Sequence, residues 1–281
     1  MDVVGDIMTK RVITCTSKDS LLEIQKLLVK HRISRVVVTD IEKKPVGILT
    51  QKDIVNFLLA DTSKRGIEEI PAKEVMSKNL ITVKPIAPIP DAAKTMMKNK
   101  ISSLVVEDDD GKLEGITTKV DISLYFASKG TGIYSVHDFM TPNPITVRQS
   151  QSIFLAVSLM SENKISRIVV TDEKAKPAGI ITLTDVTLIS SLLKPARAIK
   201  ENKPVFLKGI LFPPKGIHLL TAKDFMTVDP ISVNEDADLA DAARLMTKNG
   251  VSGLPVINTA GKLVGIVTKS DLTKAVASLK K

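Results

Sequence analysis

The feature that most limits how this chain of 281 residues can fold is a fourfold internal repeat. Each copy starts with a methionine that follows an apolar residue and precedes Thr or Ser: Met8, Met76, Met140 and Met226. A glycine follows each methionine by 39 residues, a threonine by 42 and an aspartate by 45. Because no copy has an insertion or deletion in this stretch, we expect four copies of one small folding unit.

The hydrophobic pattern within a copy predicts an α/β unit of order β-α-β-β-α. In the third copy we expect strands at 143–147, 168–170 and 178–181 and helices at 153–162 and 185–193. A unit of about 60 residues buries too little surface to be stable alone. We therefore expect copies one and two, and copies three and four, to fold as pairs.

The composition excludes several classes of protein. One cysteine, Cys15, rules out a disulfide framework and a Cys-rich zinc site, and it is expected to be buried rather than reactive. The three histidines are far apart, so no metal site is indicated. We find no secretory signal, membrane-length apolar run or nucleophile–base pair. These observations predict a cytoplasmic protein without catalytic residues, one that is not an enzyme and does not enter a membrane.

The end of each copy carries a Gly-apolar-x-Thr-x-x-Asp pattern, here called the Thr–Asp element. The four pairs are Thr50 and Asp53, Thr118 and Asp121, Thr182 and Asp185, and Thr268 and Asp271. Thr followed three residues later by an acidic residue is typical of a helix capping box. The same helix start could hold a polar ligand, with the carboxylate bonded to a ribose diol and a cation from elsewhere on the phosphate. Both interpretations are open at this point.

With these spacings, the repeat resembles the CBS domain, a regulatory unit named after cystathionine β-synthase. The resemblance covers residues 4–59, 72–128, 136–193 and 222–279. Four copies resemble two of the family's tandem pairs, called Bateman modules, here 1–132 and 133–281, the second with a basic insert at 194–221. The layout is similar to that of the γ subunit of AMP-activated protein kinase and of stand-alone prokaryotic four-repeat proteins.

The resemblance implies binding of adenosine compounds in clefts between paired repeats. The Thr and Asp of each element would hold ribose, and residues of the first strands would flank adenine: Ile13, Thr14, Ile81, Thr82, Ile145, Thr146, Ile231 and Ser232. The start of a repeat's second strand and the residue before its aspartate would reach the phosphate of a nucleotide held by the partner repeat.

The copies differ at these phosphate positions. Repeat one offers Arg35 and Lys52, repeat three offers Arg167, and repeats two and four offer no cation. The resemblance therefore implies two phosphate-binding clefts: Thr118 and Asp121 with Arg35 and Lys52, and Thr268 and Asp271 with Arg167. The clefts at Asp53 and Asp185 are expected to be empty or to hold an uncharged or cationic adenosine compound.

We therefore predict a regulatory, energy-sensing protein that binds AMP, ADP or ATP, with S-adenosylmethionine as another candidate ligand, and signals to a separate protein. It would be a monomer with four repeats or a homodimer. The alternative is an interaction scaffold or nucleic-acid-binding protein that uses the basic segment 194–223. This segment carries six lysines and one arginine against one glutamate.

Overall fold

The computed structural model describes residues 2–61, 63, 65–182, 185, 205–207, 210–212 and 220–279. The chain divides into two compact units, which are treated separately below. Unit 1 comprises residues 1–129 and 269–281, and unit 2 comprises residues 130–268. The last helix of the fourth repeat therefore belongs to unit 1, whereas the repeat boundaries predicted from the sequence place it in the second module.

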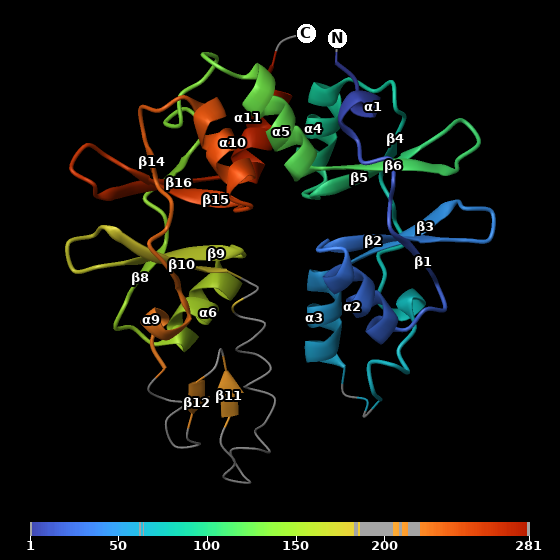
Figure 1. Cartoon of the computed structure of the whole chain (residues 1–281), viewed down its shortest axis with the longest axis horizontal. Coiled ribbons are helices and arrows are strands. Elements are labelled where there is room, and N and C mark those ends of the chain that lie inside the picture. The colour runs from blue at the N-terminus through green and yellow to red at the C-terminus, as the bar shows by residue number, and fades with distance from the viewer. Residues whose placement is uncertain are drawn as a thin grey trace. The chain divides into compact units, whose positions relative to one another are not determined.

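Unit 1 contains the first two repeats and one later helix (Figure 1). Its elements are α1 (Val4–Ile7), β1 (Thr14–Thr16), α2 (Leu21–Lys30), β2 (Arg35–Thr39), β3 (Pro45–Thr50), α3 (Gln51–Ala60), η1 (Ala72–Glu74), β4 (Thr82–Val83), α4 (Ile89–Lys98), β5 (Ser103–Glu107), β6 (Leu113–Thr118), α5 (Lys119–Lys129) and α11 (Lys269–Ala277). Helix α11 packs on α4 and α5.

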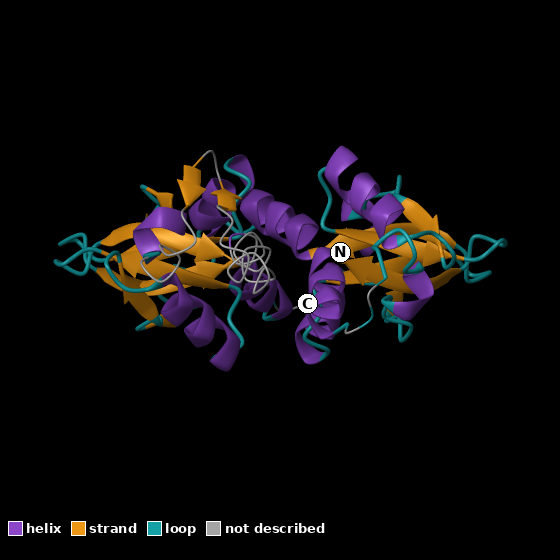
Figure 2. Cartoon of the chain, turned by 90° about the horizontal axis from the view of Figure 1, so that it is seen from below, coloured by secondary structure: helices purple, strands orange, loops and turns teal. Residues whose placement is uncertain are grey.

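Unit 2 contains the third repeat and most of the fourth. Its elements are β7 (Thr141–Pro142), β8 (Thr146–Arg148), α6 (Ile153–Glu162), β9 (Arg167–Thr171), β10 (Pro177–Thr182), β11 (Val205–Leu207), β12 (Ile210–Phe212), α9 (Ala222–Phe225), β13 (Thr227–Val228), β14 (Val233–Asn234), α10 (Leu239–Lys248), β15 (Gly253–Ile257) and β16 (Leu263–Thr268). In each unit, helices lie beside the strands (Figure 2).

Each repeat forms a small mixed sheet. Its first strand pairs in parallel with the second, and the second pairs antiparallel with the third, as in β1-β2-β3 and β4-β5-β6. The parallel step needs a crossover, which the intervening helix provides. In repeat one this helix starts at a capping box formed by Ser20 and Glu23. The α/β fold of repeated β-α-β-β-α units is thus confirmed.

The segment at the start of each repeat leaves its own sheet and pairs with its partner. In unit 2, β7 of repeat three pairs with β16 of repeat four, and β13 of repeat four pairs with β10 of repeat three. In unit 1, single bridges join Thr9 to Ile116 and Ile48 to Ser77. Neither repeat of a pair completes its sheet region without the other.

The repeated methionines and glycines make this exchange specific. A Cβ atom built on Gly47 would lie 2.5 Å from Sδ of Met76, and one built on Gly115 would lie 2.6 Å from Sδ of Met8. In unit 2, Gly265 faces Met140 and Gly179 faces Met226 in the same way. Each methionine thus occupies space that the glycine of the partner repeat leaves open, which explains why both recur at a fixed offset.

The structure modifies one sequence prediction and leaves two others almost wholly outside the described residues. Strand β8 begins at Thr146, so 143–147 was too early, because Asn143 has a positive φ of 48° and turns the chain after β7. Apart from Asp185, the predicted helix at 185–193 lies outside the described residues, and so does most of the basic segment. Within that segment, β11 and β12 pair in antiparallel orientation.

Candidate functional site

The hydrogen bonds of the Thr–Asp element are described in three repeats, and in repeats one and two they cap the helices α3 and α5. The backbone N–H and the hydroxyl of Thr118 both donate to Oδ2 of Asp121, each at 2.7 Å. Thr50 donates to Asp53 at 2.9 and 2.7 Å, and Thr182 donates to Asp185 at 2.9 and 2.8 Å. Thr268 ends β16, and Asp271 lies in the first turn of α11. The capping interpretation is therefore correct for repeats one and two, and in all three repeats Oδ2 of the aspartate accepts both bonds from the threonine.

Asp121 differs electrostatically from an ordinary surface carboxylate. Burial raises the pKa of its carboxyl group, while the hydrogen bonds from Thr118 and the positive charge of Arg35 act in the opposite direction. A partly desolvated carboxylate binds a hydrogen-bond donor more strongly than one in bulk water does.

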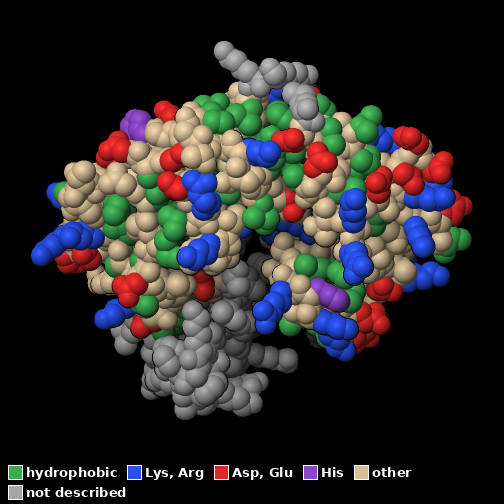
Figure 3. Space-filling model, turned by 45° about the horizontal axis from the view of Figure 1, so that its top comes forward, with side chains coloured by type: hydrophobic (Ala, Val, Ile, Leu, Met, Phe, Trp, Pro, Cys, Tyr) green, Lys and Arg blue, Asp and Glu red, His purple; other side chains and the backbone are tan. Residues whose placement is uncertain are grey.

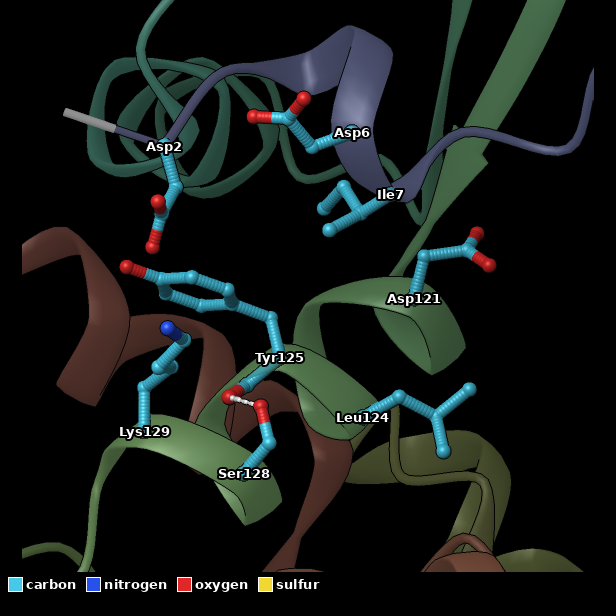
Figure 4. A pocket seen from close by; sticks show the side chains of 8 residues that line it. All are labelled: Asp2, Asp6, Ile7, Asp121, Leu124, Tyr125, Ser128 and Lys129. Atoms are coloured by element: carbon cyan, nitrogen blue, oxygen red, sulfur yellow. Dashed lines mark hydrogen bonds between the residues drawn. The ribbon is translucent and has the colours of Figure 1, made fainter.

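A cavity of about 490 Å³ lies beside Asp121 (Figure 4). The N-terminal segment contributes Asp2, Asp6 and Ile7, and one face of α5 contributes Asp121, Leu124, Tyr125, Ser128 and Lys129. Tyr125 extends towards Asp2, while Asp121 and Lys129 lie at opposite ends. This volume is within the range of small-molecule sites, about 300–1,000 Å³. The sequence did not indicate Asp2, Asp6 or Tyr125, because they lie outside the repeated motifs.

Arg35 connects the two repeats of unit 1. Its Nη1 donates to Oγ of Ser102 at 3.1 Å and its Nη2 to Oγ of Ser34 at 3.2 Å. Burial lowers the pKa of the Arg35 guanidinium, and the negative charges of Asp121 and Asp53 raise it. Arg35 is therefore a half-buried charge placed between two Thr–Asp elements, not a solvated surface arginine.

Arg167 has the corresponding position in unit 2 and reaches repeat four. A Cβ atom on Gly253 would collide with its Nη1 and lie 3.2 Å from its Cδ. Gly253 is paired with Thr268 in the sheet. Arg167 thus lies over a residue without a side chain, next to the threonine of the fourth Thr–Asp element.

The two lysines near the helix starts of unit 1 differ from the sequence-based expectation. Lys52 lies exposed in the first turn of α3, and no contact places it beside Arg35. Lys119, which the sequence analysis did not select, donates to Oγ of Ser270 at 2.9 Å. Burial lowers the pKa of Lys119, and so does Arg35, whereas Asp271 raises it. A signal for Lys119 existed in the sequence, because Thr-Lys-x-Asp occurs in repeats two and four.

The residues predicted to flank adenine lie at the first strands. Thr14 and Ile231 are exposed, and the other six are half-buried: Ile13, Ile81, Thr82, Ile145, Thr146 and Ser232. The hydroxyl of Thr82 donates to Glu107 at 3.0 Å, and that of Ser232 donates to the carbonyl of Pro230 at 3.2 Å. Their contact with a ligand stays a prediction.

Other reactive groups form no further centre in the part of the chain that the structure describes. Cys15 is buried, which raises the pKa of its thiol to about 12. No group of three or more His, Cys, Asp and Glu side chains there could hold a metal ion. No described helix is long and apolar enough to cross a membrane. The cytoplasmic location stays a prediction.

The basic segment lies almost wholly outside the described residues, so the nucleic-acid alternative stays untested. On the face seen in Figure 3, basic and acidic side chains are interspersed rather than gathered by sign. On this face, the described side chains therefore offer no large basic patch for a phosphate backbone.

Comparison with known proteins identifies the repeat. A family model described as the CBS domain matches residues 4–60, 72–128, 136–191 and 222–278. The protein MJ1404 of Methanocaldococcus jannaschii is 30% identical over 282 residues, which cover 99% of this chain and 62% of that protein. The L-aspartate semialdehyde sulfurtransferase of the same organism is 39% identical over 127 residues, 45% of this chain and 24% of the enzyme. The chain thus spans less than two thirds of either relative.

Solved structures share the fold. The crystal structure of M. jannaschii MJ1225, proposed to be an archaeal homologue of γ-AMPK, has a TM-score of 0.75 at 22% identity and covers 97% of this chain and 99% of its own. Two CBS-pair proteins cover about half of this chain. Arabidopsis thaliana CBSX2 was solved with AMP (29% identity, 53% of this chain, 99% of that chain, TM-score 0.40). The CBS pair of MJ0100 was solved with 5′-methylthioadenosine and S-adenosylmethionine (35% identity, 45% of this chain, 97% of that chain, TM-score 0.41).

Proposed function

The chain belongs to the CBS-domain family, and from this premise we propose that it is a regulatory protein that binds an adenosine compound beside Asp121. The proposal rests on three observations: a half-buried carboxylate at the start of α5, an arginine whose charge acts on that carboxylate, and a cavity along the same face of α5. The cavity is large enough for a nucleoside. Asp121 supplies acceptors for ribose hydroxyls, and Arg35 supplies a donor for a phosphate.

The capping bonds of Asp121 are compatible with ligand binding. They use Oδ2, while Oδ1 is the oxygen that the cap does not use. A carboxylate has about four lone-pair sites and can accept further hydrogen bonds. The cap therefore holds the carboxylate in one orientation before a ligand arrives, which lowers the entropy cost of binding.

Regulation would follow from a difference in ligand affinity between two conformations, which a separate protein senses. In this proposal the protein catalyses no reaction and acts in the cytoplasm. AMP, ADP and ATP are the nucleotides we expect to bind. The acidic lining from Asp2 and Asp6 also makes S-adenosylmethionine and uncharged adenosine reasonable ligands.

The test is a thermal-shift panel with adenosine, AMP, ADP, ATP, methylthioadenosine and S-adenosylmethionine, followed by calorimetry. A ligand that binds the native state raises the unfolding temperature. We expect at least one compound to do so, and Asp121→Ala to remove the effect. If no compound stabilises the protein or gives heat at millimolar concentration, the proposal is wrong.

A matched control separates ligand loss from cap loss. Thr221 and Asp224 form a capping box of the same spacing, with Thr221 donating to Asp224 twice at 2.8 Å, at the start of α9. Asp224→Ala therefore removes an equivalent cap and should leave ligand binding unchanged. A salt titration tests the alternative function, because binding to a nucleic acid backbone weakens steeply with salt.

A further inference from the structure

Arg35 joins the starts of α3 and α5, the two helices that carry Asp53 and Asp121. Its guanidinium is hydrogen-bonded to the hydroxyls of Ser34 and Ser102. The carbonyl of Ser34 accepts from the N–H of Gln51 at 3.0 Å, and that of Ser102 accepts from the N–H of Lys119 at 3.1 Å. Gln51 and Lys119 are the first residues of α3 and α5, so one side chain is anchored at both helix starts.

The charges around Arg35 are shared in the same way. Asp121 and Asp53 both raise the pKa of its guanidinium, so the positive charge acts on both Thr–Asp elements. In the sheets, Arg35 pairs with Thr50, and the equivalent residue Ser103 pairs with Thr118. The position that carries a cation in repeat one therefore carries a neutral hydroxyl in repeat two.

The neighbouring lysines do not replace the cation that repeat two lacks at position 103. Lys52 is exposed, and Lys119 is bonded to Ser270 of α11. Among the residues that the structure describes in unit 1, Arg35 is thus the cation bonded to serines of both repeats. Arg35 is therefore a preplaced phosphate donor between the Asp53 and Asp121 elements, whereas Lys129 lines only the cavity beside Asp121.

We infer that Arg35 is one cation shared by the Asp53 and Asp121 sites, so that anionic nucleotides bind the two sites with negative cooperativity. A phosphate at one site draws the guanidinium away from the other, and the second phosphate loses a charge-assisted hydrogen bond. An uncharged nucleoside has no phosphate to bind the guanidinium, so it binds both sites independently. This inference rests on the proposed function and adds a rule for how charged and uncharged ligands differ.

The test places a second cation at position 103 of repeat two. Calorimetry on the full chain would measure AMP and adenosine binding to the wild type, to Ser103→Arg and to the neutral control Ser103→Gln. Unit 2 is unchanged in all three, so the differences belong to unit 1. We expect Ser103→Arg to strengthen the weak AMP step of unit 1 by about ten- to a hundredfold. Adenosine binding should stay the same, and Ser103→Gln should behave as the wild type with both ligands.

A competition experiment on the wild type gives a second measurement that needs no variant. One bound equivalent of AMP should weaken a second AMP but not adenosine. Three results would overturn the inference: Ser103→Arg is folded by circular dichroism but leaves every AMP step unchanged; AMP binds the wild type in the same independent steps as adenosine; or neither ligand binds. The last result also removes the proposed function, whereas the first two leave it intact.

Discussion

The two units place the same arginine against different partners. In unit 1, Arg35 donates to the hydroxyl of Ser102 at 3.1 Å. In unit 2, Arg167 lies over Gly253, where any Cβ would collide with its guanidinium. A polar side chain holds one arginine, and the lack of a side chain makes room for the other. The arginine crossing from the odd to the even repeat is therefore common to both units, while the position that holds Ser103 in unit 1 holds Gly253 in unit 2.

The largest effect is expected when each arginine is removed in turn, which tests whether the two units bind phosphate differently. Arg35→Ala should weaken the tightest AMP step by about ten- to a hundredfold, because a charge-assisted hydrogen bond is worth about 1.5–3 kcal/mol. Adenosine should be affected far less. Arg167→Ala should alter only a separate, weaker AMP step. Calorimetry that showed the reverse assignment would mean that the phosphate donors have been attributed to the wrong units.

The next largest effect concerns the methionine–glycine contacts. A Cβ atom on Gly179 would lie 2.8 Å from Cβ of Met226, close to its main chain. A Cβ atom on Gly115 would lie 2.6 Å from Sδ of Met8, a flexible end, and 3.1 Å from the carbonyl oxygen of Thr9. Gly179→Ala should therefore lower the free energy of unfolding by about 1–3 kcal/mol, as overpacking does. Gly115→Ala should cost less. Urea denaturation of the full chain measures both, and equal losses would contradict the distinction.

A smaller effect is expected from exchanging the residues at the equivalent positions 253 and 103. Gly253→Ser gives unit 2 the serine found at position 103 and should displace Arg167. AMP binding at that unit should weaken by about two- to tenfold, since one ordinary hydrogen bond contributes about 0.5–1.5 kcal/mol. The matched variant Ser103→Gly should change AMP binding little. If Gly253→Ser has no effect on AMP titrations, Arg167 does not act from this position.

The smallest expected effect is a difference between the units in how stability depends on pH. Cys15 in unit 1 corresponds to Val147 in unit 2, and both are buried. Burial raises the pKa of the Cys15 thiol to about 12 from 9.0. The folded state then retains a proton that the unfolded state releases, so stability falls as the pH rises from 9 towards 12. Urea denaturation at pH 8 and pH 10 should show a smaller decline for Cys15→Val, and identical declines would exclude this contribution.

The repeat order was predictable from the sequence because local signals recur in phase. The helix expected at 153–162 has those bounds, starting after the capping residue Ser152. The pairing of the first segment of each repeat with the sheet of its partner repeat was not predictable. Met8 lies at the same offset from Gly47 in its own copy as Met76 does from Gly115, so the sequence could not tell that Met8 packs on Gly115.

The site was predictable only as far as residue type allows. Arg35 stood out as a cation at the start of a strand, but long side chains have many rotamers, so its bonds to Ser34 and Ser102 could not be derived. Lys119 was missed because its importance depends on α11, which is distant in sequence. The cavity involves Asp2 and Tyr125, which belong to no repeated pattern.

The position of α11 has a consequence for biosynthesis. This helix packs on α4 and α5, although the ribosome makes it only after all of unit 2. A nascent chain that already contains repeats one and two therefore still exposes the surface that α11 will cover. Docking of α11 is a contact of very long sequence separation, which is slow to form because loop closure comes first. Maturation of unit 1 thus waits for the translation of α11, which follows unit 2 in the chain.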